Sequence, residues 1–204
     1  MKKNILYVFA LMLMTGSAAY SQAQLAIGIK GGLNFANLDI SSTSGAYNSR
    51  TGYHAGAFLL VKFSKIGIQP EIIFSRQGSS YKPVTGTSLD TRFDYVNIPV
   101  VLKLYTVAGI NIQVGPQIGF VAGASQDVVN TATGAIQSQD IKSLVKGTDF
   151  SAALGLGWDA PFGLTVDARY NLGLSKINDA TGSSDAKNQV IQVSVGFKLI
   201  KLGK

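Results

Sequence analysis

The sequence predicts an all-β fold, an eight-stranded antiparallel up-and-down transmembrane β-barrel with short periplasmic turns and four long external loops. Three observations predict it. Apolar and polar residues alternate with a period of two in eight segments, and long and short connections alternate between those segments. Only 14% of the 204 residues are charged, whereas soluble domains carry about a quarter. The length fits one domain.

The first observation is the alternation. In the segment 164–176, apolar residues share one face and polar residues the other, as in a β-strand with two different faces. The same pattern occurs in seven further segments, 25–35, 51–64, 67–77, 92–105, 110–124, 147–159 and 188–199. At about 11 to 14 residues these segments exceed ordinary strands of about 5 or 6, but they suit tilted strands that cross a bilayer.

The connections form the second pattern. Long segments rich in Ser, Thr, Gly and Asp are 37–50, 78–91, 125–146 and 177–187. Short turns at 64–66, 106–109 and 160–163 lie between them. Outer-membrane barrels join their strands by short periplasmic turns and long external loops. Both termini are therefore expected at the periplasmic end.

The low charge decides which face meets lipid. A soluble, lipocalin-like barrel is the alternative, but its water-facing side should carry both signs of charge. The polar face of 110–124 carries no charge at all, as expected for the narrow interior of an eight-stranded barrel. Aromatic residues form two expected girdles on the apolar face, Phe35, Tyr53, Phe74, Phe120 and Tyr170 toward the loops and Phe63, Trp158 and Phe197 toward the turns.

The first 23 residues are expected to be a signal peptide. Lys2 and Lys3 precede an apolar run from Ile5 to Met14, and Ser21-Gln22-Ala23 suits the small-x-small cleavage rule. The domain is then 24–204. Cleavage after Ser21 is the second choice. Export to the outer membrane follows from this interpretation.

Three short motifs then resemble one protein family. They are Gln69-Pro70-Glu71 followed by Phe74-Ser75 and Gly78, Tyr95-Val96-Asn97-Ile98-Pro99, and Gly115-Pro116 with Gly119. In this order they resemble the PorT-type outer-membrane β-barrel proteins of Bacteroidota, over about 25–199. The resemblance implies an eight-stranded outer-membrane barrel. One member of that family is associated with protein export and gliding, but no residue here distinguishes that member. The chain departs from the common barrel ending because it continues past Phe197 to Lys204.

The candidate site is a polar plug inside the barrel. In the simplest register Gly155 lies opposite Arg169 and Gly157 opposite Asp167, and each glycine leaves space for its neighbour. The side chains expected to fill the lumen are Glu71, Asp167, Arg169, Tyr95, Gln117 and His54. Lys30, Lys62, Lys103 and Lys198 share the inward face and are expected to extend toward water near the periplasmic mouth.

Composition argues against catalysis, cofactors and metals. The chain has no cysteine and one histidine, which excludes thiolate sites and disfavours multi-histidine ones. His54 would need an acid and a nucleophile nearby, and Ser42 and Asp94 are placed on a loop and on the opposite face. Asp127 and Asp140 lack calcium-loop spacing. The sequence therefore predicts no enzyme.

Partners follow from location and loops. The expected partners are outer-membrane lipid and lipopolysaccharide, and envelope proteins through the external loops. In the longest loop, Ile141, Leu144 and Val145 have helical spacing after a possible cap, Ser138. This turn either rests on the barrel mouth or binds a partner. The net charge of +7 is concentrated in the signal peptide and at the periplasmic end, so nucleic acid is not expected.

The functional prediction is a structural or interaction protein that presents external loops. A narrow porin-like channel for small solutes is the alternative, as is an accessory component of a protein export system. The sequence does not predict the oligomeric state.

Overall fold

The computed structural model describes residues 23–39, 46–82, 89–129, 135–144, 147–174 and 187–203. The described strands are β1 (Gln24–Asp39), β2 (Ala46–Phe63), β3 (Ile66–Lys82), β4 (Leu89–Tyr105), β5 (Ile110–Val129), β6 (Ile136–Asp140), β7 (Thr148–Asp159), β8 (Leu164–Gly173) and β9 (Lys187–Leu202), with a short 3-10 helix, η1 (Lys142–Leu144). The expected signal peptide lies outside these residues, apart from Ala23. No helix among the described residues is long and apolar enough to cross a membrane.

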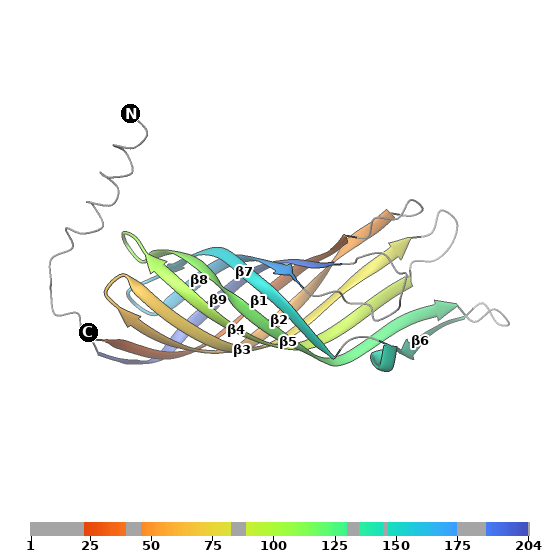
Figure 1. Ribbon diagram of the computed structural model, residues 1–204, viewed down its shortest axis with the longest axis horizontal. Coiled ribbons are helices and arrows are strands. Elements are labelled where there is room, and N and C mark those ends of the chain that lie inside the picture. Colours follow the sequence, from red (N-terminus) through yellow and green to blue (C-terminus); the bar gives the residue numbers. More distant parts are fainter. Residues whose placement is uncertain are drawn as a thin grey trace, which may run out of the picture.

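Eight of these strands close into a barrel (Figure 1). Each pairs antiparallel with its neighbours in the order β1, β2, β3, β4, β5, β7, β8 and β9, and β9 pairs with β1 to close the ring. The predicted eight-stranded up-and-down barrel is therefore confirmed. The additional strand β6 pairs with the far end of β5, and the ribbon of these two strands extends beyond the barrel (Figure 1).

The short turns all lie at one end of the barrel, here called the turn end; the opposite end is the loop end. Ser64 and Lys65 connect β2 to β3, and Ser64 has a positive φ of 50°. Gly109, with φ 83°, ends the turn between β4 and β5, where a side chain would meet the carbonyl of Asp159. β1 begins and β9 ends at the turn end, since Leu25 pairs with Leu202.

At the loop end the strands are longer than the sequence predicts. Much of the expected loops 37–50 and 78–91 is strand, with Ala46 paired to Lys82 and Ser79 to Thr91. The backbone ladder continues because hairpin pairing needs only backbone groups. The Ser- and Thr-rich composition therefore does not mark the ends of the strands, and the expected boundaries there are wrong. β8 has 10 residues and ends at Gly173, before the expected 176, whereas β5 has 20.

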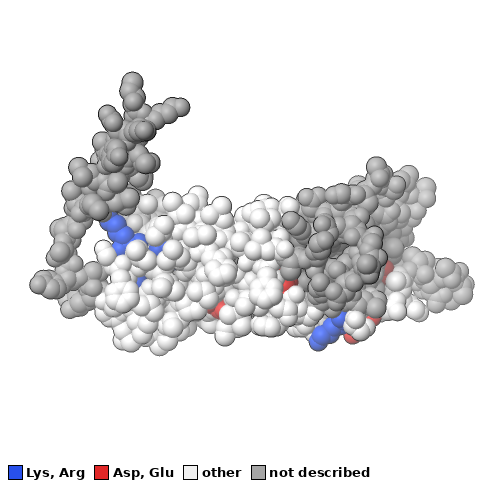
Figure 2. Space-filling view, in the orientation of Figure 1, with Lys and Arg blue, Asp and Glu red and all other residues white. Residues whose placement is uncertain are grey.

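The two faces of the wall follow the predicted alternation. The aromatic residues expected in the two girdles are all exposed on the outer face. Figure 2 shows one side of the barrel, where charged side chains gather toward the ends and the middle of the wall is almost uncharged. The inward residues are buried and mostly polar. This distribution fits a wall surrounded by hydrocarbon.

The turn at 141–144 rests on the barrel mouth. The side chain of Ile141 packs against a buried cluster of Tyr95, Val121 and Ala124, together with Phe93, and its backbone N–H donates to the Ala124 carbonyl over 3.0 Å.

The expected cap of this turn was wrong. Ser138 lies in β6, and the backbone N–H of Lys142 instead donates to Asp140 Oδ1 over 2.8 Å. A carboxylate directly before the turn reaches its first N–H groups, as an N-cap requires. Val145 and the side chain of Leu144 lie outside the described residues.

Candidate functional site

Four oppositely charged side chains meet in the middle of the barrel. This central charge cluster consists of Lys30 from β1, Glu71 from β3, and Asp167 and Arg169 from β8. The two terminal nitrogens of Arg169 donate to the two oxygens of Glu71 over 2.6 and 2.8 Å. Lys30 Nζ donates to both oxygens of Asp167 over 3.0 Å. The cluster has two charges of each sign, so it is neutral while buried.

A second group, the lower charge cluster, closes the interior near the turn end. Asp159 is its only anion and binds Lys103 over 3.0 Å and Lys198 over 2.9 Å. Tyr105 Oη donates to the same carboxylate over 2.8 Å. Asn111 Nδ2 donates to Asp159 Oδ1 over 3.4 Å. Gln113 donates to Asn111 Oδ1 and accepts from Arg169 Nε, so these two amides link the two charge clusters.

The register of β7 and β8 is the one expected from the sequence. Gly155 pairs with Arg169 and Gly157 with Asp167. A side chain at Gly155 would collide with the backbone carbonyl of Ala168 and would lie 2.8 Å from the Cγ atom of Arg169, so this glycine makes room for the neighbouring strand as well as for the arginine. A side chain at Gly157 would instead collide with the amide of Gln113. The second glycine therefore makes room for the neighbouring amide and not for Asp167.

The lysines of the inward face do not extend toward water as expected. Lys30, Lys103 and Lys198 are buried and ion-paired. Lys62 is half-buried, with its Nζ 4.1 Å from the centroid of the Tyr105 ring. The reason is that each buried carboxylate needs compensating charge, and the flexible lysine stems can reach it inside the barrel.

Above the central charge cluster, toward the loop end, the interior is lined mostly by neutral polar side chains, together with the carboxylate of Asp149. An amide network centres on Asn34, whose Oδ1 accepts from His54 Nδ1 over 2.8 Å and from Gln192 Nε2 over 3.1 Å. Its Nδ2 donates to Ser75 Oγ over 2.9 Å. Gln192 in turn accepts from Asn171 over 2.7 Å. We call this part the outer half of the interior and the two charge clusters the inner half.

His54 occupies a defined tautomer within this network. Because Asn34 Oδ1 can only accept, His54 Nδ1 carries the proton and His54 Nε2 accepts from Ser194 Oγ over 2.8 Å. Neither partner was among the sequence candidates. Ser42 lies outside the described residues, and Asp94 lies on the outer face, where it binds Arg76 over 2.6 Å.

A serine, a histidine and an asparagine joined in this way resemble the hydrogen-bonded chain that activates a serine nucleophile. Such chemistry also requires that substrate reach the hydroxyl. His54 and Ser194 are each 2% exposed, and neither lines the cavity described next. Among the described residues, no group of three or more His, Cys, Asp or Glu could hold a metal ion.

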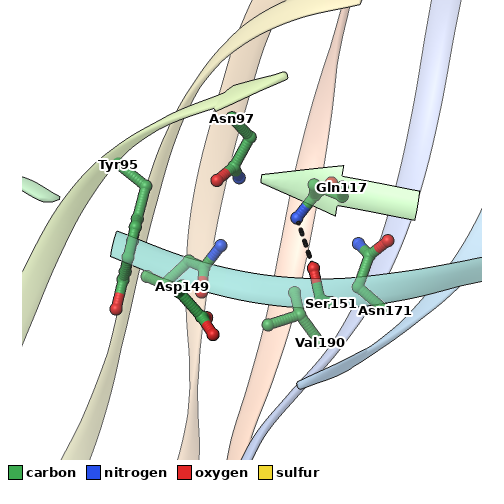
Figure 3. Close-up of a pocket in the computed structure, with 8 residues that line it drawn as sticks. Tyr95, Asn97, Gln117, Asp149, Ser151, Asn171 and Val190 are labelled. Carbon is green, nitrogen blue, oxygen red and sulfur yellow. Dashed lines mark hydrogen bonds between the residues drawn. The ribbon is translucent and has the colours of Figure 1, made fainter. Parts of the chain in front are cut away.

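A small polar cavity lies in the outer half (Figure 3). Tyr95 and Gln117 line it, so these two predicted plug residues do not join the charged ones. Gln117 donates to Ser151 Oγ over 3.0 Å. The side chains of Asn97 and Asn171 turn toward the same space (Figure 3). Its full lining is Gln77, Tyr95, Asn97, Gln117, Asp149, Ser151, Asn171 and Val190.

The motif residues of β4 and β5 have separate structural roles. A side chain at Gly115 would collide with the carbonyl of Val100 on the neighbouring strand, and one at Gly119 would lie 2.7 Å from Asn97 Oδ1. The two glycines therefore permit close strand contact and the inward position of Asn97. Tyr95 and Pro99 are buried on the inward face, whereas Pro116 is exposed on the outer face.

The sequence interpretation missed several residues of the inner half. Asp159, the centre of the lower charge cluster, is not among the residues that the sequence predicts for the plug. It shares the inward face of β7 with Gly155 and Gly157, so the alternation alone could have identified it. Tyr105 likewise shares the inward face of β4 with Lys103.

The comparisons with known proteins agree with this architecture. The model of one family, the outer membrane protein β-barrel domain, matches residues 20–179. The chain belongs to this family. It is therefore an outer-membrane β-barrel protein whose exposed apolar wall contacts membrane lipid and lipopolysaccharide. No curated protein matches the sequence at a significant level.

Two solved structures illustrate the likeness of this family member. The neisserial surface protein NspA is 13% identical, with a TM-score of 0.54 over 85% of this chain and 97% of that one. Ail, the attachment invasion locus protein of Yersinia pestis, in complex with the heparin analogue sucrose octasulfate, is 15% identical, with a TM-score of 0.50 over 89% and 99%. At these identities the likeness concerns the fold alone.

Proposed function

We propose that this outer-membrane barrel is a closed, non-catalytic interaction protein that presents its loop end to partners outside the cell. The observation that carries the proposal is the paired charge in the interior. Seven charged side chains from six strands meet there, and each is at least nine-tenths buried. Opening a path for ions would separate these pairs, and an unpaired buried charge is strongly unfavourable.

The interaction surface that we propose is the ribbon formed by β5 and β6. It extends beyond the barrel (Figure 1), and all five residues of β6 are exposed. The ribbon is held to the barrel by the packing of Ile141 against the cluster of Tyr95, Val121 and Ala124. External loops on a rigid barrel are common carriers of recognition. Envelope proteins are the partners that this position favours.

The test is single-channel recording of the purified protein in planar bilayers. The expected result is no steady conductance from the unmodified chain, because the interior is closed. A matched control is the triple variant Glu71→Ala, Asp167→Ala and Arg169→Ala, which leaves Lys30 without a carboxylate and empties the middle of the barrel. This variant should show brief openings at most, because the lower charge cluster still closes the turn end. A large steady conductance of the unmodified protein would overturn the proposal.

A narrow channel is the second candidate, and one observation favours it. The buried charges are four cations, Lys30, Lys103, Arg169 and Lys198, against three anions, Glu71, Asp159 and Asp167. One positive charge therefore remains in excess. A channel through this interior would prefer anions. In the recording described above, with different KCl concentrations on the two sides, the reversal potential would then lie near the equilibrium potential of chloride.

Within the family, we propose a place in the PorT-type branch known from Bacteroidota. The support is the order of the three motifs along the chain and the linked positions of Asn97 and Gly119. The proposal does not include a role in protein export. Co-purification from native outer membranes would test such a role, since an export component should bring the export machinery with it.

We also propose that residues 1–23 are a cleaved signal peptide. The support is the sequence pattern, together with the start of β1 at Gln24. Intact-mass measurement of protein extracted from outer membranes should give a chain that begins at Gln24, or less favourably at Gln22. A mass that includes Met1 to Ala23 would contradict the proposal.

A further inference from the structure

The cavity of the outer half contains two buried polar atoms without a partner. Asn97 Nδ2 and Asn171 Oδ1 have no hydrogen bond, although the two residues are only 2% and 4% exposed. Both residues line the same cavity (Figure 3). Buried polar groups in folded proteins are almost always satisfied by protein or by a bound molecule. Two unsatisfied atoms at one cavity therefore indicate an occupant.

The two atoms define the chemistry of that occupant. Asn97 Nδ2 is a donor and needs an acceptor, whereas Asn171 Oδ1 is an acceptor and needs a donor. An anion would satisfy only the first atom, and it would also face the carboxylate of Asp149 in the cavity wall. A cation could pair with the Asp149 carboxylate and satisfy the second atom, but it would leave the Asn97 Nδ2 donor without an acceptor. A neutral hydroxyl satisfies both.

The size of the cavity limits the occupant further. The centre of a water-sized molecule has about 10 Å³ in which to move, which is about what one water molecule needs. The cavity thus admits one oxygen atom with its hydrogen. The rest of a larger solute would have to remain outside, toward the loop end.

We propose that this cavity is a binding site for one hydroxyl group, which accepts a hydrogen bond from Asn97 Nδ2 and donates one to Asn171 Oδ1. The hydroxyl comes from water or from the end of a small polyol that enters from the loop end. Gln117, Ser151 and Gln77 complete the polar wall. The site goes beyond the proposed interaction role, since it makes the outer half of the interior a solute-binding recess.

The recess is closed below the bound hydroxyl. Asn171 donates to Gln192, and Gln192 donates to Asn34, which also binds His54. Beneath this network lies the central charge cluster. A solute held at the cavity therefore has no path onward through the barrel.

The first test uses the unmodified protein in lipid nanodiscs. Nuclear magnetic resonance can detect cross-relaxation between side-chain amide hydrogens and a bound water molecule. We expect such signals for the side-chain amides of Asn97 and Asn171. Gln113 is the matched control, because its amide lies in the inner half and already donates to Asn111; it should give none.

Addition of glycerol distinguishes the two sources of the hydroxyl. Loss of the water signals, with shifts confined to the amides of the cavity, would assign the site to polyols. Retention of the water signals would assign it to water. Absence of water signals together with no response to glycerol would overturn the proposal.

A cavity-filling variant provides an independent test with a different readout. Val190 lines the cavity and is 2% exposed, so Val190→Leu adds a methylene to the space. If a hydroxyl is bound, the variant displaces it, leaves both atoms unsatisfied and lowers Tm. If the cavity is empty, better packing should raise Tm, and that result would contradict the site.

Discussion

The two halves of the barrel interior differ in how their buried polar side chains are paired. The inner half buries seven charges and leaves each in an ion pair or cluster. The outer half buries amides, hydroxyls and one histidine, and it retains a cavity with two unsatisfied atoms. The free energy of an unpaired charge is far larger than that of an unpaired amide. An unpaired amide atom can therefore persist, as at Gln69 in the inner half and at Asn97 and Asn171 in the outer half, whereas each of the seven buried charges has a partner.

The largest expected effect comes from breaking the central charge cluster. Arg169→Ala leaves Glu71 and Asp167 with Lys30 as their only close cation, and it should lower the free energy of unfolding by about 3–5 kcal/mol. Urea unfolding in lipid vesicles, followed by the fluorescence of Trp158, would measure it.

A double variant supplies the control for that experiment. Glu71→Gln combined with Arg169→Met removes one charge of each sign, so it should destabilise the barrel less than Arg169→Ala alone. Equal losses would mean that packing, and not charge pairing, stabilises the inner half.

The next effect tests whether charge is tolerated only on the inward face. Val100 is exposed on the outer face of β4, so Val100→Arg would place a charge in hydrocarbon and should cost about 2–4 kcal/mol near the midplane. Val107 lies in a turn and is 76% exposed, and Val107→Arg should cost little in the same unfolding assay. Similar costs at the two positions would contradict the assignment of the lipid face.

A matched pair of glutamines compares the two halves directly. Gln113 and Gln117 are both buried on the inward face of β5. Gln113 accepts from a charged guanidinium over 2.6 Å, so Gln113→Leu should cost about 1.5–3 kcal/mol. Gln117 donates only to a neutral hydroxyl, so Gln117→Leu should cost about 1 kcal/mol. The reverse order in urea unfolding would refute the comparison.

The smallest effect is expected at the exposed pair of Arg76 and Asp94. Their side chains are 43% and 28% exposed, and Arg76 also lies over the Tyr53 ring at 5.5 Å. Arg76→Ala should lower the free energy of unfolding by at most about 1 kcal/mol. The cost should be smaller at high salt, because salt already weakens the ion pair in the unmodified protein. Unfolding in low and high salt would check this, with Arg169→Ala as the salt-insensitive reference.

Sequence reasoning was most successful where the alternation has a physical cause. Lipid on one side and a narrow interior on the other require alternating residues, which is why Arg169 and Gly155 could be paired from the sequence. The same reasoning identified Glu71 and Asp167 as inward residues. It could not assign the lysines, because a flexible stem reaches either water or a carboxylate and only the three-dimensional structure shows which.

The strand ends, the cap of the turn and the partners of His54 could not be predicted, because they depend on the three-dimensional pairing of strands and not on composition. The extension of β3 to Lys82 follows from backbone pairing across the hairpin, and side-chain polarity does not report it. The position of Asp140 as the cap of the turn depended on where β6 ends. The hydrogen bonds of His54 to Asn34 and Ser194 link residues from three strands, whose relative levels a strand pattern does not determine.

The unequal strand lengths make the barrel wall differ in height from one side to the other. β5 exceeds β8 by ten residues, which corresponds to about 33 Å of extended strand. Among the described strands, the wall is thus tall beside β4 and β5 and low beside β7 and β8. The proposed β5–β6 interaction surface belongs to the tall side, so a partner that binds it would contact that side of the barrel. Rotation of the barrel about the membrane normal therefore changes which side of the barrel a membrane-bound partner can contact.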